Sequence, residues 1–268
     1  MDISGRSSRK GLETGLWGLR AVRKQSLPRS LIFLLAGLAV ALGLKLHYRQ
    51  AGPGELAWML APTARLVSLA SGVEFEFESG AGWINRSRAF VIAPPCAGIN
   101  FLVILALALC LVTLRERPGR HTLFWWAAAH GSAYGAAIIV NALRIILALE
   151  GPELDGIAGL DAAQQHRWAG VITYLCGLWA AIRAWRRLCP RRSADQAGWG
   201  NGHRRVAGRG WLWIPPAVYL AVALGIPLVR ALKTGLESGF AMHGMTVAAG
   251  CLFVWGGLNL LQSLLASR

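Results

Sequence analysis

Charged side chains are scarce in this chain, and acidic ones are the scarcest. Lys, Arg, Asp and Glu make up 15% of the 268 residues, and only 13 are acidic against 28 basic. So few charges, with 54% hydrophobic residues and a mean hydropathy of +0.44, argue against a soluble domain and favour a polytopic membrane protein. The net charge of +15 would indicate nucleic-acid binding in a soluble protein, but basic loops also orient membrane proteins.

The sequence also lacks the cysteine patterns of metal sites and disulfide frameworks. None of the five cysteines belongs to a CxxC pair or has zinc-ligand spacing. Cys110, Cys176 and Cys251 lie inside apolar runs, where cysteine is typically a small core residue. The sequence therefore predicts no disulfide framework and indicates neither a metal nor a cofactor.

Long apolar runs dominate the chain. Crossing about 30 Å of hydrocarbon takes about 20 residues. Runs of suitable length lie at about 30–47, 97–114, 122–148, 168–185, 211–230 and 246–265. The first follows a basic segment and has no convincing cleavage site after it, so we expect a retained span and no cleaved signal peptide. We predict an all-α polytopic membrane protein with about six transmembrane helices.

The region between the first two runs predicts a small cover outside the membrane. The run 56–71 is short and carries Pro62 and Arg65, which favours an interfacial or re-entrant helix. In 73–78, apolar residues alternate with three glutamates, which predicts a strand. That strand could pair with 88–92 as a β-hairpin across a Gly-rich turn.

Basic residues gather on one side if both termini are cytoplasmic. With six spans and that orientation, the inside segments are 1–29, 115–121, 183–209 and 266–268. They hold 19 of the 28 Lys and Arg but 4 of the 13 acids, as the positive-inside rule requires. Counting 56–71 as a full span would translocate 183–209 with its eight arginines, so we reject that topology. Membrane orientation explains the basic charge, and we predict no nucleic-acid binding.

Three chemically active residues fall at the outer ends of different spans. Cys96 follows two prolines and begins the second span, Arg144 comes one bilayer crossing after the start of the third, and His166 lies at the mouth of the fourth. Short loops keep neighbouring helix ends close, so we expect these side chains to meet on the extracytoplasmic face.

Their chemistry is that of a cysteine acyl-transfer site. The thiolate is the nucleophilic form of cysteine, and the unpaired N–H groups at a helix N-terminus stabilise it. Pro94 and Pro95 prevent an earlier helix start and should hold Cys96 in the first turn. His166 could transfer a proton near neutral pH, and Arg144 could stabilise an oxyanion. Each residue alone has an ordinary alternative role at the membrane interface.

Around these residues the sequence resembles the exosortase/archaeosortase family of membrane-embedded cysteine transpeptidases. The matching segments are P-P-C-A-G-I-N at 94–100, N-A-L-R-I at 141–145 and H-R-W-A-G at 166–170. The resemblance covers roughly residues 30–185. It implies a catalytic membrane core there, between cytoplasmic basic segments at 1–29 and 186–210, with a C-terminal two-helix segment at 211–268.

The resemblance implies a catalytic Cys96, an essential Arg144 and His166 as third member. It also implies the partners: exported proteins that end in a short motif, a transmembrane helix and a basic tail, the PEP-CTERM-like signal often found with exopolysaccharide loci. Cleavage would pass the acyl group through a thioester to an unknown acceptor, at the outer face of the bacterial inner membrane. No subtype is assigned.

Further residues have expected supporting roles. We expect backbone N–H groups of Ala97 and Gly98 to help bind the oxyanion, and Asn141, one turn before Arg144, to orient its guanidinium. Gln165 is a weaker candidate beside His166, and His243 is a rival base. Two other functions stay open: a small transporter, and a non-catalytic assembly factor of an envelope or exopolysaccharide export system.

Overall fold

The computed structural model describes residues 30–116, 121–150, 162–189, 217–221, 223–224, 244–254 and 256–257, and for 162–167 it describes the backbone alone. The described chain is mostly helical. Three of its helical segments are long and apolar enough to cross a membrane: Ser30–Gln50, Thr122–Glu150 and Pro94–Glu116, whose first three residues form a 3₁₀ turn. They coincide with three predicted runs and are compatible with a helical membrane protein.

For the other three predicted spans, the structure describes no helix that is both long and apolar enough to cross a membrane. The run 168–185 lies inside the long helix α5, Ala162–Leu188, but polar residues at both ends make α5 less apolar than the other three. The structure describes only 217–221 and 223–224 of the run 211–230. Of the run 246–265 it describes 246–254 and 256–257, and Gly244–Val254 forms an apolar helix shorter than a span. Six spans and cytoplasmic termini therefore remain predictions.

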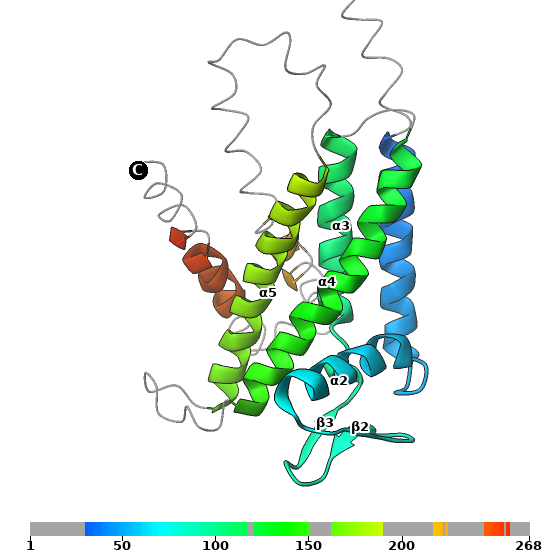
Figure 1. Cartoon of the computed structure of the whole chain (residues 1–268). Coiled ribbons are helices and arrows are strands. Elements are labelled where there is room, and N and C mark those ends of the chain that lie inside the picture. Colours follow the sequence, from blue (N-terminus) through cyan, green and yellow to red (C-terminus); the bar gives the residue numbers. More distant parts are fainter. Residues whose placement is uncertain are drawn as a thin grey trace, which may run out of the picture.

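Helices α3 (Ile99–Glu116), α4 (Thr122–Glu150) and α5 pack against one another to form the core of the bundle. Figure 1 shows them side by side with the Ser30–Gln50 helix, drawn in blue. Most of α3 is buried because it is apolar on every face, the composition of a helix surrounded by others. The Ser30–Gln50 helix is far more exposed and meets α4 where the Trp126 indole donates to the Phe33 carbonyl at 3.1 Å.

The short run 56–71 forms the helix α2, Ala57–Ser71, as predicted. It lies across one end of the bundle (Figure 1) and buries Met59, Leu60 and Val67. Tyr134 of α4 donates a hydrogen bond of 2.6 Å to the Trp58 carbonyl, and the two rings stack. These contacts fix α2 to α4 at the end of the bundle where α3 begins.

The predicted hairpin is a three-stranded antiparallel sheet. Strands β1 (Glu76–Glu78), β2 (Gly82–Asn85) and β3 (Phe90–Ile92) pair in the order β1-β2-β3. The expected pairing of 73–78 with 88–92 is therefore wrong, because β2 lies between them. Alternation predicted the first strand and the expected partner segment contains the third, but the glycine-rich segment that we expected to be a turn supplies the central strand.

Candidate active site

Cys96 closes a short turn that is separate from α3. Pro94–Cys96 forms a 3₁₀ turn, in which the Cys96 N–H donates to the Ala93 carbonyl at 2.8 Å. Gly98 then adopts a left-handed φ of +69°, and α3 begins at Ile99. The expected position of Cys96 in the first turn of the α-helix is thus corrected: the thiol precedes α3 by three residues. The prolines do set the turn, since their fixed φ suits its first positions.

Of the two expected backbone donors, Ala97 has a partner within the turn, and Gly98 lies against Asn141. The Ala97 N–H donates to the Pro94 carbonyl at 3.0 Å, which counts against Ala97 as an oxyanion donor. Gly98 makes room for Asn141: a Cβ on Gly98 would lie 2.8 Å from the Asn141 Cγ. Both this contact and the positive φ require glycine at position 98.

Asn141 ties α4 to the turn that carries the thiol. Its side chain is fully buried, and its Nδ2 donates a hydrogen bond of 2.6 Å to the Cys96 carbonyl. Its Oδ1 accepts a hydrogen bond of 3.0 Å from the Tyr174 hydroxyl on α5. We expected Asn141 to orient Arg144; in the structure it reaches Arg144 through Tyr174 and directly holds the Cys96 turn.

Arg144 lies against Tyr174. Its Nη1 donates to the Tyr174 hydroxyl at 3.4 Å, and its guanidinium carbon lies 5.4 Å from the centre of the Tyr174 ring. Gly170, one turn before Tyr174, leaves space for the arginine: a Cβ there would lie 3.0 Å from the Arg144 Nε. A larger residue at 170 would displace the guanidinium from this position.

The thiol of Cys96 is half-buried among tyrosines from two other helices. It lies close enough to the Tyr48 and Tyr174 hydroxyls to interact with both electrostatically. Tyr48 belongs to the Ser30–Gln50 helix, where Lys45 contacts the Tyr48 ring and hydrogen-bonds to the Asn100 side chain at the start of α3. The first helix therefore also borders the Cys96 turn.

The structure brings part of the predicted site together. Cys96 and Arg144 share Tyr174 as a neighbour at one end of the bundle, and Asn141 joins them. His166 and Gln165 lie near the start of α5, one turn before Gly170, but their side chains are outside the described part of the structure. His243 also falls outside the described residues.

Sequence reasoning missed Tyr174, Gly170 and Tyr48. A signal for the first two was present, because 166, 170 and 174 recur every four residues and so follow one face of a helix. Tyr48 carried no such signal, since its place beside Cys96 depends on how the first helix packs.

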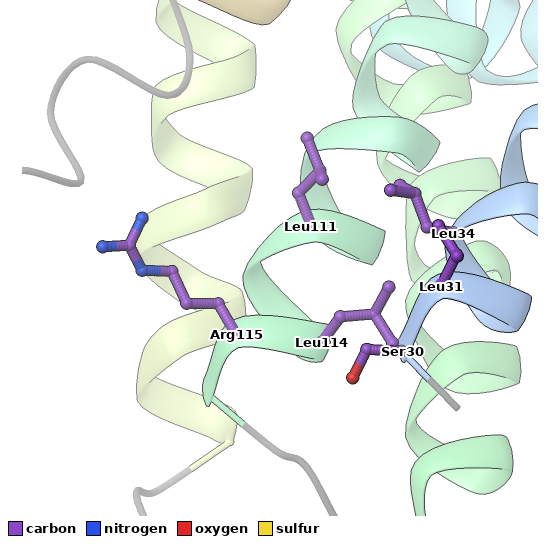
Figure 2. Close-up of a pocket in the computed structure, with 6 residues that line it drawn as sticks. All are labelled: Ser30, Leu31, Leu34, Leu111, Leu114 and Arg115. Carbon is purple, nitrogen blue, oxygen red and sulfur yellow. The ribbon is translucent and has the colours of Figure 1, made fainter. Parts of the chain in front are cut away.

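A pocket of about 400 Å³ lies away from these residues. It is lined by Ser30, Leu31 and Leu34 of the first helix and by Leu111, Leu114 and Arg115 of α3 (Figure 2). Those segments begin the first helix and end α3, whereas Lys45 and Asn100 border the Cys96 turn at the opposite ends of the same two helices. The pocket is thus no part of the candidate site.

No protein-family model, curated protein or solved structure matches this chain. Among the described residues, no group of three or more His, Cys, Asp and Glu could hold a metal ion. The candidate site therefore stands on its own geometry: a thiol, a guanidinium, a buried amide and a phenol that come from three elements packed together.

Proposed function

We propose that this protein is a membrane-embedded cysteine transpeptidase or protease that cleaves a C-terminal sorting signal of exported proteins. The observation that carries the proposal is the continuous contact from Cys96 through Asn141 and Tyr174 to Arg144. A half-buried thiol at the end of a bundle, near an arginine that donates a hydrogen bond to the neutral Tyr174 hydroxyl, suits nucleophilic attack on a carbonyl.

The reaction proceeds through a thioester. The Cys96 thiolate attacks the backbone carbonyl of the substrate, and Arg144 stabilises the tetrahedral oxyanion that forms. The C–N bond then breaks, and the leaving amine takes a proton from His166. An acceptor nucleophile, or water, attacks the thioester carbonyl, gives up its proton to the same imidazole and releases the Cys96 thiolate.

The substrate reaches the site from the membrane. In the proposed topology the chain has six spans, both termini are cytoplasmic, and Cys96 lies at the outer face of the bacterial inner membrane. A substrate transmembrane helix packs beside the bundle and presents its adjacent short motif to the thiol. The distribution of Lys and Arg supports this orientation, because cytoplasmic segments then carry most of them.

The test is processing of an exported protein that ends in a short motif, one span and an Arg-rich tail, taken from the same genome. Cys96→Ala should abolish processing while membrane insertion stays normal. Cys176→Ala is the matched control, because Cys176 is an exposed thiol on α5. Unchanged processing by Cys96→Ala would eliminate the proposal and favour a transporter or assembly factor.

A trapping experiment identifies the intermediate. A peptide carrying the short motif and an electrophile should attach to Cys96 in the wild-type chain, and mass spectrometry should find the adduct on the peptide that contains residue 96. Attachment at Cys176 instead would indicate reactivity set by exposure alone.

A further inference from the structure

We propose that Tyr174 is a positioning residue that fixes the Arg144 guanidinium relative to the Cys96 turn. The inference rests on the proposed function for its catalytic meaning, but the contacts that carry it are independent of any substrate. Hydrogen bonds through Tyr174 and Asn141 connect the arginine on α4 to the backbone carbonyl of Cys96.

The hydroxyl of Tyr174 uses its donor and an acceptor position in this network. It donates its proton to the Asn141 Oδ1 at 3.0 Å and accepts from the Arg144 Nη1 at 3.4 Å. The donation also sets the amide orientation, because an Oδ1 that accepts from Tyr174 leaves Nδ2 to donate to the Cys96 carbonyl. One hydroxyl thus helps to position both the Arg144 guanidinium and the turn that carries Cys96.

The ring of Tyr174 is held separately from its hydroxyl. It stacks on Phe101 with ring centres 4.6 Å apart and planes 8° from parallel. Phe101 is 1% exposed, in the first turn of α3. Replacing Tyr174 by Phe therefore keeps the stacked ring in place and removes the hydroxyl alone.

Loss of the Tyr174 hydroxyl should slow the proposed reaction and speed up alkylation of the Cys96 thiol. Without its acceptor the guanidinium loses a fixed orientation toward the developing oxyanion, so turnover falls while substrate binding changes little. Without the Tyr174 donor, the Asn141 side chain loses one of the two hydrogen bonds that hold it, and the Cys96 turn is held less firmly. A looser turn exposes the half-buried thiol more often, so alkylation of Cys96 becomes faster.

The experiment compares Tyr174→Phe with Tyr134→Phe in the full-length chain. Tyr134 is the matched control because its hydroxyl also donates one interhelical hydrogen bond, of 2.6 Å to Trp58, outside the network. We expect kcat for processing to fall about tenfold in Tyr174→Phe with KM nearly unchanged, the effect of losing a hydrogen bond to a charged group. Tyr134→Phe should keep wild-type kinetics.

A second measurement keeps the inference separate from the proposed function. Alkylation of Cys96 by N-ethylmaleimide, followed on the peptide that contains it, should be several-fold faster in Tyr174→Phe and unchanged in Tyr134→Phe. This comparison decides the positioning role even if Cys96→Ala leaves processing intact and the proposed function fails. Wild-type alkylation in Tyr174→Phe, or equal effects in both tyrosine variants, would overturn the inference.

Discussion

The buried amide of Asn141 donates a hydrogen bond of 2.6 Å to the backbone carbonyl of Cys96, 45 residues earlier in the chain. This bond attaches the turn that carries the thiol to the middle of a different helix. The position of the sulfur therefore depends on the packing of α4 against the Cys96 turn and Gly98.

Asn141→Ala should lower the free energy of unfolding by about 2–3 kcal/mol, because it removes two hydrogen bonds of a buried amide and leaves the Cys96 carbonyl without this donor. Asn85→Ala is the control, since the Asn85 amide also uses both ends in an exposed part of the sheet: it donates to the Glu74 carbonyl at 2.7 Å and accepts from the Ser87 hydroxyl and the Arg88 N–H. Thermal unfolding in detergent measures both. Equal losses would show that burial of the Asn141 amide does not matter.

Gly98→Ala should destabilise the chain more than Gly72→Ala. Both glycines have a left-handed φ, +69° and +70°, so the conformational penalty of about 1–2 kcal/mol is common to both. Only at Gly98 would the new Cβ collide with a side chain, that of Asn141, whereas Gly72 has nothing within 4 Å. The difference in unfolding temperature between the two variants reports the collision, and no difference would mean that Asn141 moves aside freely.

Gly177→Ala should weaken the contact between α4 and α5. A Cβ there would lie 2.6 Å from both methyl groups of Val140. Gly135→Ala is the control: in the described part of the chain nothing lies within 4 Å of a Cβ at that position, so the better helix propensity of alanine should stabilise α4 by about 0.5–1 kcal/mol. Denaturation in detergent should shift in opposite directions for the two variants; a shift in the same direction would contradict the packing.

Glu116 and Arg186 join the ends of α3 and α5 by an ion pair of 2.7 Å that is largely shielded from solvent. Removing one partner leaves a shielded charge, so Glu116→Gln should lower stability by about 1–3 kcal/mol. Replacing the neighbouring Arg187, which is exposed, by Gln should change stability by less than about 0.5 kcal/mol. A double-variant cycle over Glu116 and Arg186 measures the coupling, which is absent if the pair contributes nothing.

Periodicity and run length predicted the larger elements. The three long apolar helices and α2 lie where hydropathy places them, because each helix satisfies its own backbone and needs only an apolar surface. Strand pairing was predicted wrongly at β2, since Gly82–Asn85 is short and its partners are chosen by the fold around it. Local sequence carries little information on such pairings.

The sequence was enough to predict reactive residues of the candidate site, but not which side chains contact one another there. Cys96, Arg144 and Asn141 could be singled out because polar and reactive residues are uncommon near the expected outer ends of apolar runs. The contact of Gly98 with Asn141 and of Gly170 with Arg144 depends on which helix faces meet, and a sequence does not state that directly. Tyr174 was missed for the same reason, although it lies two turns after His166 on the same helix.

The left-handed residue at Gly98 has a mechanical consequence. It breaks the helical path between the Cys96 turn and α3, while Asn141 anchors that turn to α4. If a substrate helix displaces α3, the Cys96 turn should move less than α3 does. If it displaces α4, the turn should move with α4, because Asn141 holds the turn there. The position of the sulfur should therefore respond more to a substrate helix that binds against α4 than to one that binds against α3. Cross-links that immobilise α4 should accordingly impair turnover more than cross-links that immobilise α3.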